Sequence, residues 1–293
     1  METWEYLFDC AMKQVAAAKV PQKMWTFGGG TSLMLKYNHR YSKDIDIFVT
    51  SAQLLTYLSP RLTDAIEYEV GRYDELSNFI RIYLDKGEID FIHSPPITSI
   101  EPSLETIRNA TIFVDDPVEI IAKKVFYRSE EFKSRDVFDL AVVYSKHKEE
   151  VLRATEFFSP HLEKLFCRVD SLVAAGQLDR ECSELRLLAY GKQLRGQEAA
   201  IFTSFQNDIK NELSRMAAAQ SELRAFLEVT IEEAGIAEAA GLKFDVSSGS
   251  WYIHRDLLFE MPEKWGGKAS SEEFFEKMRV QMKNSKRYER GGP

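Results

Sequence analysis

A short, largely apolar run that ends in three consecutive glycines constrains the fold of this chain most. Residues 24–27 have the length of a buried strand, and Gly28–Gly30 follow directly before the small hydroxyl residues Thr31 and Ser32. Residues 31–37 then have the pattern of a helix start, so we expect a strand that turns sharply into a helix. Backbone N–H groups at such a helix start attract phosphate, although most glycine runs are plain turns.

The second constraint is a pair of aspartates that alternate with apolar residues. Asp44 and Asp46 flank Ile45, and Ile47 and Phe48 follow. On a strand, residues two apart share a face, so both carboxylates project together while the isoleucines enter the core. Carboxylates that close repel each other, and a divalent cation removes that cost. Mg²⁺ suits such a pair, with water and phosphate completing its shell; an edge strand with a polar solvent face is the alternative.

A third acidic residue lies in a predicted meander of strands at residues 68–73, 79–84 and 88–93. Asp90 is flanked by apolar residues and joins the aspartate pair if its strand neighbours theirs. Glu88 lies on the same face and is the alternative. Three carboxylates suit a two-metal site, in which one ion activates a hydroxyl and the other holds a triphosphate. An exposed strand residue with no chemical role is the alternative for Asp90.

Two helices are predicted after the strands. Asp116, Pro117 and Glu119 have the N-cap, N1 and N3 pattern of a helix start, and this helix extends to about Arg128. A second helix covers residues 134–146. The two helices carry the remaining charged candidates.

Glu119 and Lys123 are an i, i+4 pair, so Lys123 is expected to form a surface salt bridge. Lys124 lies on another, apolar face of the helix. Either a triphosphate oxygen or the snorkelling of a long side chain explains a lysine there.

Asp136 and Asp139 share one face of the second helix, and Asp139 is expected to be the more deeply buried. A structural network with Arg128 or Arg135 is the alternative to a role in chemistry for these two acids.

The domain organisation follows from the same pattern. We expect an α+β domain over residues 1–147, with a small mixed sheet flanked by helices, and a mostly helical C-terminal domain over residues 148–293. Helices are expected at 148–157, 160–175, 179–191 and 196–235, a short hairpin within 244–253, and a last helix at 270–285.

The composition excludes several classes of protein. Acidic residues exceed basic ones by 46 to 38, so the net charge of −8 argues against non-specific binding of nucleic acid, and any such contact needs a local basic patch. The three cysteines have no metal-ligand spacing. Without a signal-peptide pattern or a membrane-spanning stretch, we expect a cytoplasmic protein with no membrane partner.

Together these motifs resemble the AbiEii/AbiGii nucleotidyltransferase toxin family, which has a DNA polymerase β-like nucleotidyltransferase fold. The resemblance covers about residues 20–145. It rests on Gly29–Leu33, on His39, Arg40, Ser42 and Asp44–Phe48, and on Glu119–Arg128 followed by Arg135–Leu140.

The resemblance implies roles for individual residues. The phosphates of the nucleotide would be held by Gly29, Gly30, Thr31, Ser32 and Lys124. The metal ligands would be Asp44 and Asp46, with Asp90 matching a third acid by order alone. Asp139, or Asp136, would orient groups near the substrate or take part in proton transfer. Arg40 and Ser42 would organise the loop before the aspartate strand, in either a structural or a catalytic role.

The function implied is a Mg²⁺-dependent transfer of a nucleoside monophosphate from an NTP to an acceptor hydroxyl, with tRNA as the foremost candidate. The protein would be the toxin of a toxin–antitoxin or abortive phage-defence system and would have an antitoxin partner. Two alternatives stay open: an inactive module that binds nucleotide or RNA, and an enzyme that modifies proteins. No motif fixes the NTP base or the oligomeric state.

Overall fold

The structure is a computed structural model of the chain. It describes residues 1–63, 65–67, 69–246, 249–265, 267 and 269–289, with the main chain alone for residues 216–224, 254–256, 259 and 281–289. The chain forms two compact units, Met1–Ile209 and Lys210–Pro293. Each is described by itself.

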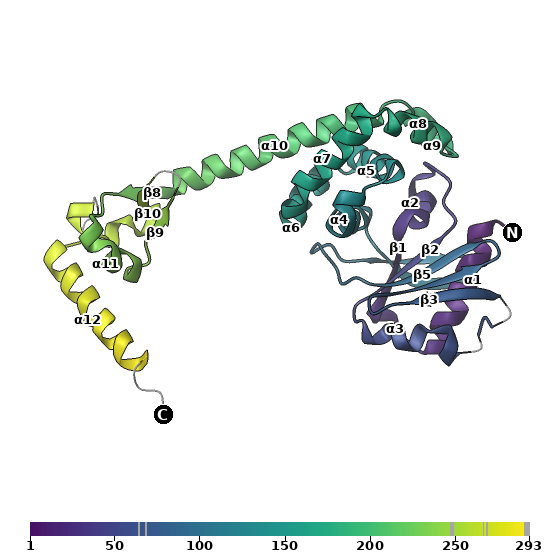
Figure 1. Ribbon diagram of the computed structural model, residues 1–293, viewed down its shortest axis with the longest axis horizontal. Helices are drawn as coiled ribbons and strands as arrows, with labels where there is room; N and C mark the ends of the chain where they lie inside the picture. Colours follow the sequence, from purple (N-terminus) through teal and green to yellow (C-terminus); the bar gives the residue numbers. More distant parts are fainter. Residues whose placement is uncertain (64, 68, 247–248, 266, 268, 290–293) are drawn as a thin grey trace. The chain divides into compact units, whose positions relative to one another are not determined.

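The centre of the first unit is a mixed seven-stranded sheet (Figure 1). Its strand order is β3-β4-β5-β2-β1-β7-β6. Strand β2 is parallel to β5 and β1 is parallel to β7, while the other neighbours are antiparallel. The strands are β1 (Trp25–Gly28), β2 (Ile45–Val49), β3 (Val70–Glu75), β4 (Phe79–Leu84), β5 (Gly87–His93), β6 (Ser103–Ile107) and β7 (Ala110–Val114).

The two faces of the sheet differ in chemistry because β2 alternates. Ile45, Ile47 and Val49 are fully buried and pack in one core with α1 (Thr3–Ala18) and α3 (Gln53–Leu58). The residues between them, including Asp46, point to the other face. Burial of the apolar set therefore fixes which way the carboxylate projects.

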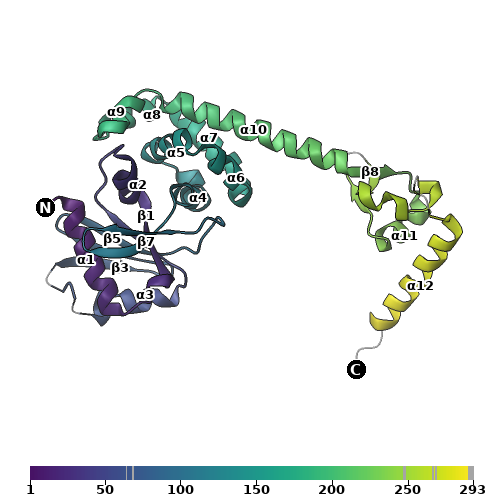
Figure 2. The ribbon, with the colours of Figure 1, turned by 180° about the vertical axis from the view of Figure 1, so that it is seen from behind.

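A second core lies among the helices that follow the sheet in the sequence. Figures 1 and 2 show α4–α8 on the opposite side of the sheet from α3. The fully buried aromatic rings of Phe138, Phe158, Phe202 and Phe205 belong to this core. The helices are α2 (Gly29–Tyr37), α4 (Pro117–Arg128), α5 (Ser134–Lys146), α6 (Lys148–Phe158), α7 (Leu162–Ala174), α8 (Gln177–Glu184), α9 (Ala189–Leu194) and α10 (Glu198–Leu223).

The predicted helix starts and the strand meander are confirmed. The side chain of Asp116 accepts a hydrogen bond from the N–H of Val118 at 2.8 Å and caps α4, with Pro117 in its first turn. Strand β6 was not predicted. The α+β class expected from the sequence is confirmed by the mixed sheet and its flanking helices.

The helix expected at residues 179–191 is wrong, because a β-like contact interrupts it. Arg40 forms an isolated bridge with Leu187, and the N–H of Leu188 donates to the carbonyl of His39 at 2.8 Å. A Cβ on Gly191 would lie 1.9 Å from that same carbonyl oxygen, so only glycine allows this approach. The backbone groups of 186–190 therefore pair with the loop before β2 instead of continuing a helix.

The second unit has its own small core, which contains Leu227, Ile253 and Trp265. The helix expected at 196–235 is too long, because α10 ends at Leu223 and a strand follows directly. The hairpin expected within 244–253 is confirmed. The elements are β8 (Arg224–Leu227), β9 (Lys243–Asp245) and β10 (Ser250–His254), in sheet order β8-β10-β9, with α11 (Ala234–Ala239) and α12 (Ser271–Glu289).

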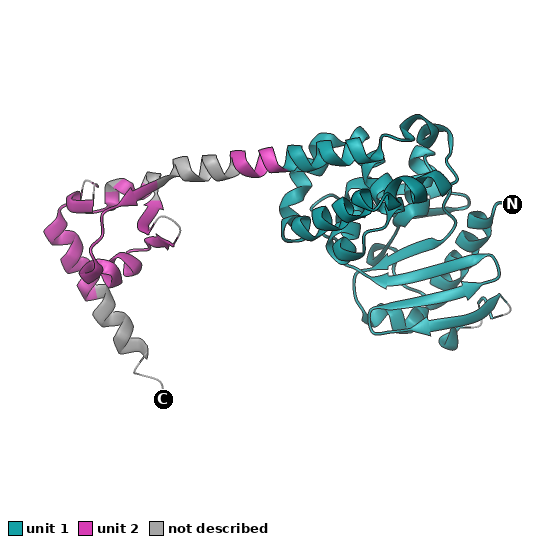
Figure 3. Cartoon of the chain, turned by 45° about the horizontal axis from the view of Figure 1, so that its top comes forward, with its two compact units in different colours: residues 1–209 teal, residues 210–293 magenta. Residues whose placement is uncertain are grey.

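The compact units divide at residues 209 and 210, not at 147 and 148 (Figure 3). Helices α6–α8 share one buried core with α4 and α5, so the first unit extends well past the predicted boundary. The expected division into a nucleotidyltransferase domain over residues 1–147 and a mostly helical domain over residues 148–293 stays a prediction. None of the helices in the described part of the chain combines the length and apolar character needed to cross a membrane.

The expectation that Lys123 is a surface residue is wrong. Its side chain is 5% exposed, and its Nζ lies 2.7 Å from Asp115 Oδ2 and 3.6 Å from Glu119 Oε1. The ammonium also lies 4.2 Å from the centroid of the Phe48 ring. The i, i+4 spacing gave the right partner, but β2 covers that face of the helix.

Glu119 is buried and fixes the segment after β5. Its carboxylate accepts hydrogen bonds from the N–H of Ile97, the N–H of Thr98 and the hydroxyl of Thr98, at 2.7–2.8 Å. A buried carboxylate is tolerated only with such partners.

We expect Glu119→Ala to lower the free energy of unfolding by about 3 kcal/mol, because it leaves buried donors and part of the Lys123 charge without a partner. Urea unfolding measures the change. Glu156→Ala is the matched control, since Glu156 is an exposed helical residue and its change should stay within about 0.5 kcal/mol. Equal stability of the two variants would contradict the structural role of Glu119.

Candidate active site

Three neighbouring strands bring the glycine turn and two acids into one row. Gly28 lies opposite Asp46 across β1 and β2, and Asp46 lies opposite Asp90 across β2 and β5. The expectation that Asp90 joins the aspartate pair if the strands are neighbours is met by this register. The row faces the helices α4 and α5.

The turn after β1 needs glycine because a carboxylate lies against its main chain. Gly29 has a φ of +69°, and a Cβ there would lie 1.8 Å from Asp46 Oδ2. Both the positive φ and the close approach exclude other residues. The glycine run is therefore a cradle for the Asp46 side chain.

Thr31 and Ser32 follow the turn. Thr31 is fully buried, and its hydroxyl donates to the backbone carbonyl of Asp44 at 2.6 Å, which fixes the start of β2. Ser32 is nearly buried. Neither side chain lines the pocket described below, whereas Gly30 does. Phosphate contacts by Thr31 and Ser32 stay predictions.

Asp44 and Asp46 are both partly exposed to one pocket. Asp44 precedes β2, and its Oδ1 accepts a hydrogen bond from the N–H of Glu88 at 3.2 Å. This bond ties the first aspartate to β5. The two carboxylates are therefore held from both sides, by the glycine turn and by the neighbouring strand.

The electrostatic setting disfavours the charged form of Asp46. Its pKa is raised to about 6, first by burial and then by the charges of Asp90 and Asp44, while Arg128 and Lys124 act to lower it. A divalent cation would relieve this repulsion. Two partly exposed carboxylates with space for water and phosphate match the donors that Mg²⁺ prefers.

Asp90 is held by an arginine. Its two oxygens accept from Nε and Nη2 of Arg81, both at 2.7 Å, and Glu88 lies 3.4 Å from the same guanidinium. Within the described residues, no three acidic, histidine or cysteine side chains are grouped to hold a metal by themselves. A metal role for Asp90, or for Glu88 as its alternative, stays a prediction.

Asp139 is the centre of a fully buried network. Its oxygens lie 2.6 Å from both Nε and Nη2 of Arg40, 2.8 Å from Nε2 of His39 and 2.5 Å from Nζ of Lys124. Burial opposes ionisation, but Arg40 and Lys124 hold the pKa of Asp139 well below its usual range. Asp139 does not line the pocket. It is placed to position Arg40 and Lys124, and a direct role in proton transfer stays a prediction.

Asp136 does line the pocket, beside Lys124. Its Oδ1 lies 2.7 Å from Lys124 Nζ, and its Oδ2 lies 3.9 Å from Arg128 Nη1. The structural network that the sequence left as an alternative is therefore present. It coexists with a position of Lys124 at the pocket wall.

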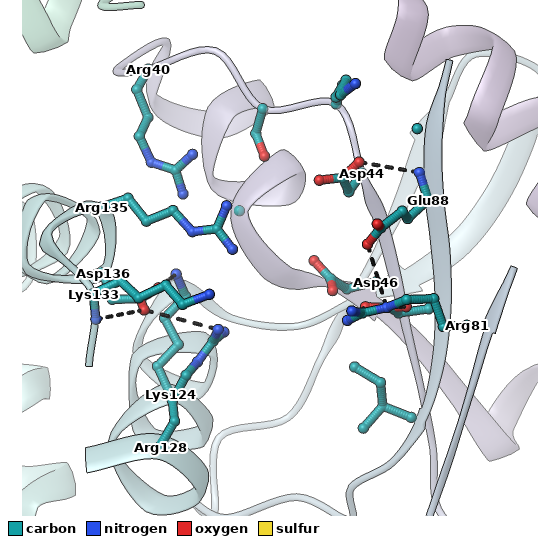
Figure 4. Close-up of a pocket in the computed structure, with 16 residues that line it drawn as sticks. Arg40, Asp44, Asp46, Arg81, Glu88, Lys124, Arg128, Lys133, Arg135 and Asp136 are labelled. Atoms are coloured by element: carbon teal, nitrogen blue, oxygen red, sulfur yellow. Dashed lines mark hydrogen bonds and ion pairs between the residues drawn. The ribbon is translucent and has the colours of Figure 1, made fainter. Parts of the chain in front are cut away.

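The pocket has a volume of about 490 Å³ and two walls of opposite charge. Figure 4 shows acids of the β2 and β5 strands on one side and cations of the α4–α5 region on the other. The charged residues that line it are Arg40, Lys43, Asp44, Asp46, Arg81, Glu88, Asp90, Lys124, Arg128, Lys133, Arg135 and Asp136.

Sequence reasoning missed the cations of this pocket as a set. Arg81 could have been placed, because a two-residue turn at 85–86 pairs Leu84 with Gly87 and so puts Arg81 opposite Asp90. Lys133 and Arg135 had a signal as well. Cations are disfavoured at the positive start of a helix, so a pair of them there indicates an anion nearby.

A strand–turn–helix cradle, a carboxylate pair and a facing wall of cations define a phosphate-transferring enzyme. The family model for the nucleotidyl transferase AbiEii toxin of type IV toxin–antitoxin systems matches residues 11–229, about three quarters of the chain. The chain therefore belongs to the AbiEii nucleotidyltransferase toxin family, as its motifs predicted, and is a nucleotidyltransferase. Membership in a toxin–antitoxin family implies an antitoxin partner.

Two solved structures are similar at low identity. A candidate nucleotidyltransferase from H. pylori is 18% identical with a TM-score of 0.42, over 73% of this chain and 96% of that one. The antibiotic-resistance factor ANT(2'')-Ia in its solution structure is 14% identical with a TM-score of 0.31, over 63% of this chain and 100% of that one. No curated protein matches the chain.

The raised pKa of Asp46 predicts that the stability of the folded protein depends on pH. An aspartate titrates near 3.8 in the unfolded chain and near 6 here, so the folded state loses stability as pH rises between these values. We expect Asp46→Asn, without divalent cation, to be more stable than the unmutated protein by about 3 kcal/mol above pH 6, and the difference should vanish towards pH 4.

Urea unfolding between pH 4 and pH 8 in the presence of a chelator measures this difference. Asp179→Asn, at an exposed aspartate of α8, is the control and should show no such pH dependence. Addition of Mg²⁺ should stabilise the unmutated protein and not the Asp46→Asn variant. A difference that is constant with pH would contradict the assignment.

Proposed function

We propose that this protein transfers a nucleoside monophosphate from an NTP to a hydroxyl of RNA, with tRNA as acceptor, and releases pyrophosphate. The supporting observation is a single pocket in which Asp44 and Asp46 face Lys124, Arg128 and Arg135. Carboxylates alone would repel a triphosphate, and cations alone would bind one without a metal. The combination suits an NTP that carries Mg²⁺.

Each residue has a defined task in this proposal. Asp44 and Asp46 would hold Mg²⁺, which would supply positive charge to the developing negative charge and to the attacking hydroxyl. Lys124 contacts the triphosphate, and Asp139 keeps that ammonium in place. The amide groups at Gly29 and Gly30 lie at the start of α2, where an anion is stabilised.

Charge and family support the proposed acceptor and biological role. The α4–α5 wall gathers Lys124, Arg128, Lys133 and Arg135 in a chain whose net charge is −8, which favours a polyanionic acceptor. We assign the protein as the toxin of a cytoplasmic toxin–antitoxin system that acts in phage defence. The antitoxin would limit transfer in the uninfected cell.

The test uses purified protein, Mg²⁺, total tRNA and the four NTPs labelled at the α-phosphate. Label should appear on RNA with the unmutated protein and with Asp179→Asn. Asp44→Asn and Asp46→Asn should each lower the rate on the order of 100-fold or more, because several kcal/mol of charge stabilisation are lost. Retained transfer in both variants would contradict the metal assignment.

Two other outcomes correspond to the alternatives. Label on protein instead of RNA would make the chain a protein-modifying nucleotidyltransferase. Calorimetric binding of NTP·Mg²⁺ without transfer to RNA or protein would favour an inactive binding module.

Substitution of the adjacent residues Lys123 and Lys124 distinguishes a role in the pocket from a role in folding. Lys124→Met should raise the KM for NTP by about 10-fold or more, since a charged partner of the triphosphate is removed. Lys123→Met removes an equally buried ammonium that pairs with Asp115 outside the pocket. Its KM should stay within about 2-fold of normal at a temperature where both variants are folded. Equal effects on KM would contradict the role of Lys124.

A further inference from the structure

A second cavity adjoins the nucleotide pocket and shares a wall with it. Its volume is about 420 Å³, within the usual range for small-ligand sites. Lys133 and Arg135 line both cavities. The remaining lining residues come from α7, α8 and the segment after α8: Arg168, Gln177, Glu181 and Leu185.

The cavity has an excess of positive charge. Arg168 is partly buried, and its Nε donates to the backbone carbonyl of Phe132 at 3.1 Å, which fixes the guanidinium at the cavity wall. Within the described part of the chain, neither Lys133 nor Arg135 has an acidic side chain within 4.0 Å of its charged nitrogens. These cations are therefore available to an external anion.

The one acid that lines the cavity is already engaged. Glu181 accepts hydrogen bonds from Gln177 Nε2 at 2.6 Å and from Ser134 Oγ at 2.8 Å, and these bonds lower its pKa. Three cations face this single carboxylate, so a net positive charge is left. The cavity contains no counterpart of the Asp44 and Asp46 pair, so it does not suit a metal-bound triphosphate.

The shared wall is the start of α5, which begins at Ser134. The positive end of the helix dipole lies there, and Lys133 and Arg135 add charge of the same sign. Asp136, in the first turn of α5, accepts a hydrogen bond from the N–H of Lys133 at 3.2 Å, but its carboxylate is already paired with Lys124. Among the described residues, the side-chain charges of Lys133 and Arg135 therefore keep no acidic partner. The helix start, the two unpaired cations and the fixed Arg168 independently favour a negatively charged ligand in this cavity.

We propose that this second cavity, lined by Lys133, Arg135 and Arg168, binds a backbone phosphate of the RNA acceptor next to its reacting hydroxyl. The inference rests on the proposed function, in which an RNA hydroxyl must reach the α-phosphate of the NTP. A nucleotide chain that ends at the first pocket needs a phosphate site directly beside it. The second cavity is at the required place, and arginine suits phosphate through its forked donors.

The experiment measures RNA binding and transfer separately, with the full chain. Binding of a fluorescent RNA hairpin with a single-stranded 3′ end is followed by anisotropy between 50 and 300 mM salt, a range over which phosphate contacts weaken strongly (about 10³-fold or more for several contacts). Arg168→Gln should weaken binding by about 10-fold and reduce the salt slope by about one phosphate contact. Lys133→Gln, at an exposed side chain, is the second variant and keeps the test valid if Arg168→Gln is unstable.

Two measurements exclude a general effect. The Kd for NTP·Mg²⁺ by calorimetry should change by less than about 2-fold in Arg168→Gln, because this residue does not line the first pocket. Arg153→Gln, an exposed arginine on α6, removes the same charge elsewhere and should leave RNA affinity unchanged. In the transfer assay, Arg168→Gln should raise the KM for RNA with kcat retained at saturating RNA.

The outcomes distinguish this inference from the proposed function. RNA binding that depends on Arg168 without any transfer to RNA supports the cavity and overturns the proposed reaction. Transfer to RNA with an unchanged KM in both the Arg168→Gln and Lys133→Gln variants overturns the cavity and leaves the reaction. Absence of RNA binding overturns the inference. The inference is also overturned if the same variants lose antitoxin binding while their RNA affinity is intact. That result would assign the cavity to an acidic protein segment.

Discussion

The ionised carboxylate of Asp139 is the interaction on which the rest of the active site depends. It is 0% exposed, yet it stays charged because cations from two separate parts of the chain surround it. Arg40 comes from the loop before β2, and Lys124 comes from α4. One buried charge on α5 therefore links the loop before β2 to α4. Removing it would leave Arg40 buried without its carboxylate partner and Lys124 with Asp136 alone, a costly state for a protein interior.

The opposing wall is set by burial and repulsion of its acids. Asp46 lies against the main chain of Gly29 and beside Asp90, and its pKa is raised to about 6, first by burial and then by the charge of Asp90. Arg81 relieves part of this repulsion by holding Asp90. In the wall around Asp139 the charges are paired with opposite charges, whereas in the wall around Asp46 the negative charges are only partly compensated. A metal-bound triphosphate would compensate both walls: the metal would add positive charge beside the acids, and the phosphates would face the cations.

The sequence was sufficient where local periodicity and turn chemistry decide the structure. The alternation around Asp46 and the cap at Asp116 are set within a few residues, so the strand and the helix were placed correctly. The burial of Lys123 was not predicted, because it depends on the ring of Phe48, which comes from a distant strand. The partners of Asp139 could not be predicted for the same reason. Its spacing predicted burial, but the identity of its partners depends on contacts about 100 positions apart in the chain.

The same limit applies to the break between α8 and α9. Local pattern favours one continuous helix at 179–191, since nothing nearby in the sequence opposes it. A pairing with the loop at 38–41 overrides that preference. Secondary-structure propensity is a weak constraint when backbone groups of a distant loop need partners.

That pairing has a consequence for the smallest fragment that could work as an enzyme. The backbone beside Arg40 is held by residues 186–190, and Gly191 fits against the carbonyl of His39. A fragment that ends after the last motif, at Leu140, would keep all of the acids and lysines that line the pocket. It would lose residues 186–190, whose backbone holds the loop that carries Arg40. The compact unit that holds these residues is therefore larger than its motifs: it includes α9, and its core includes Phe202 and Phe205 of α10.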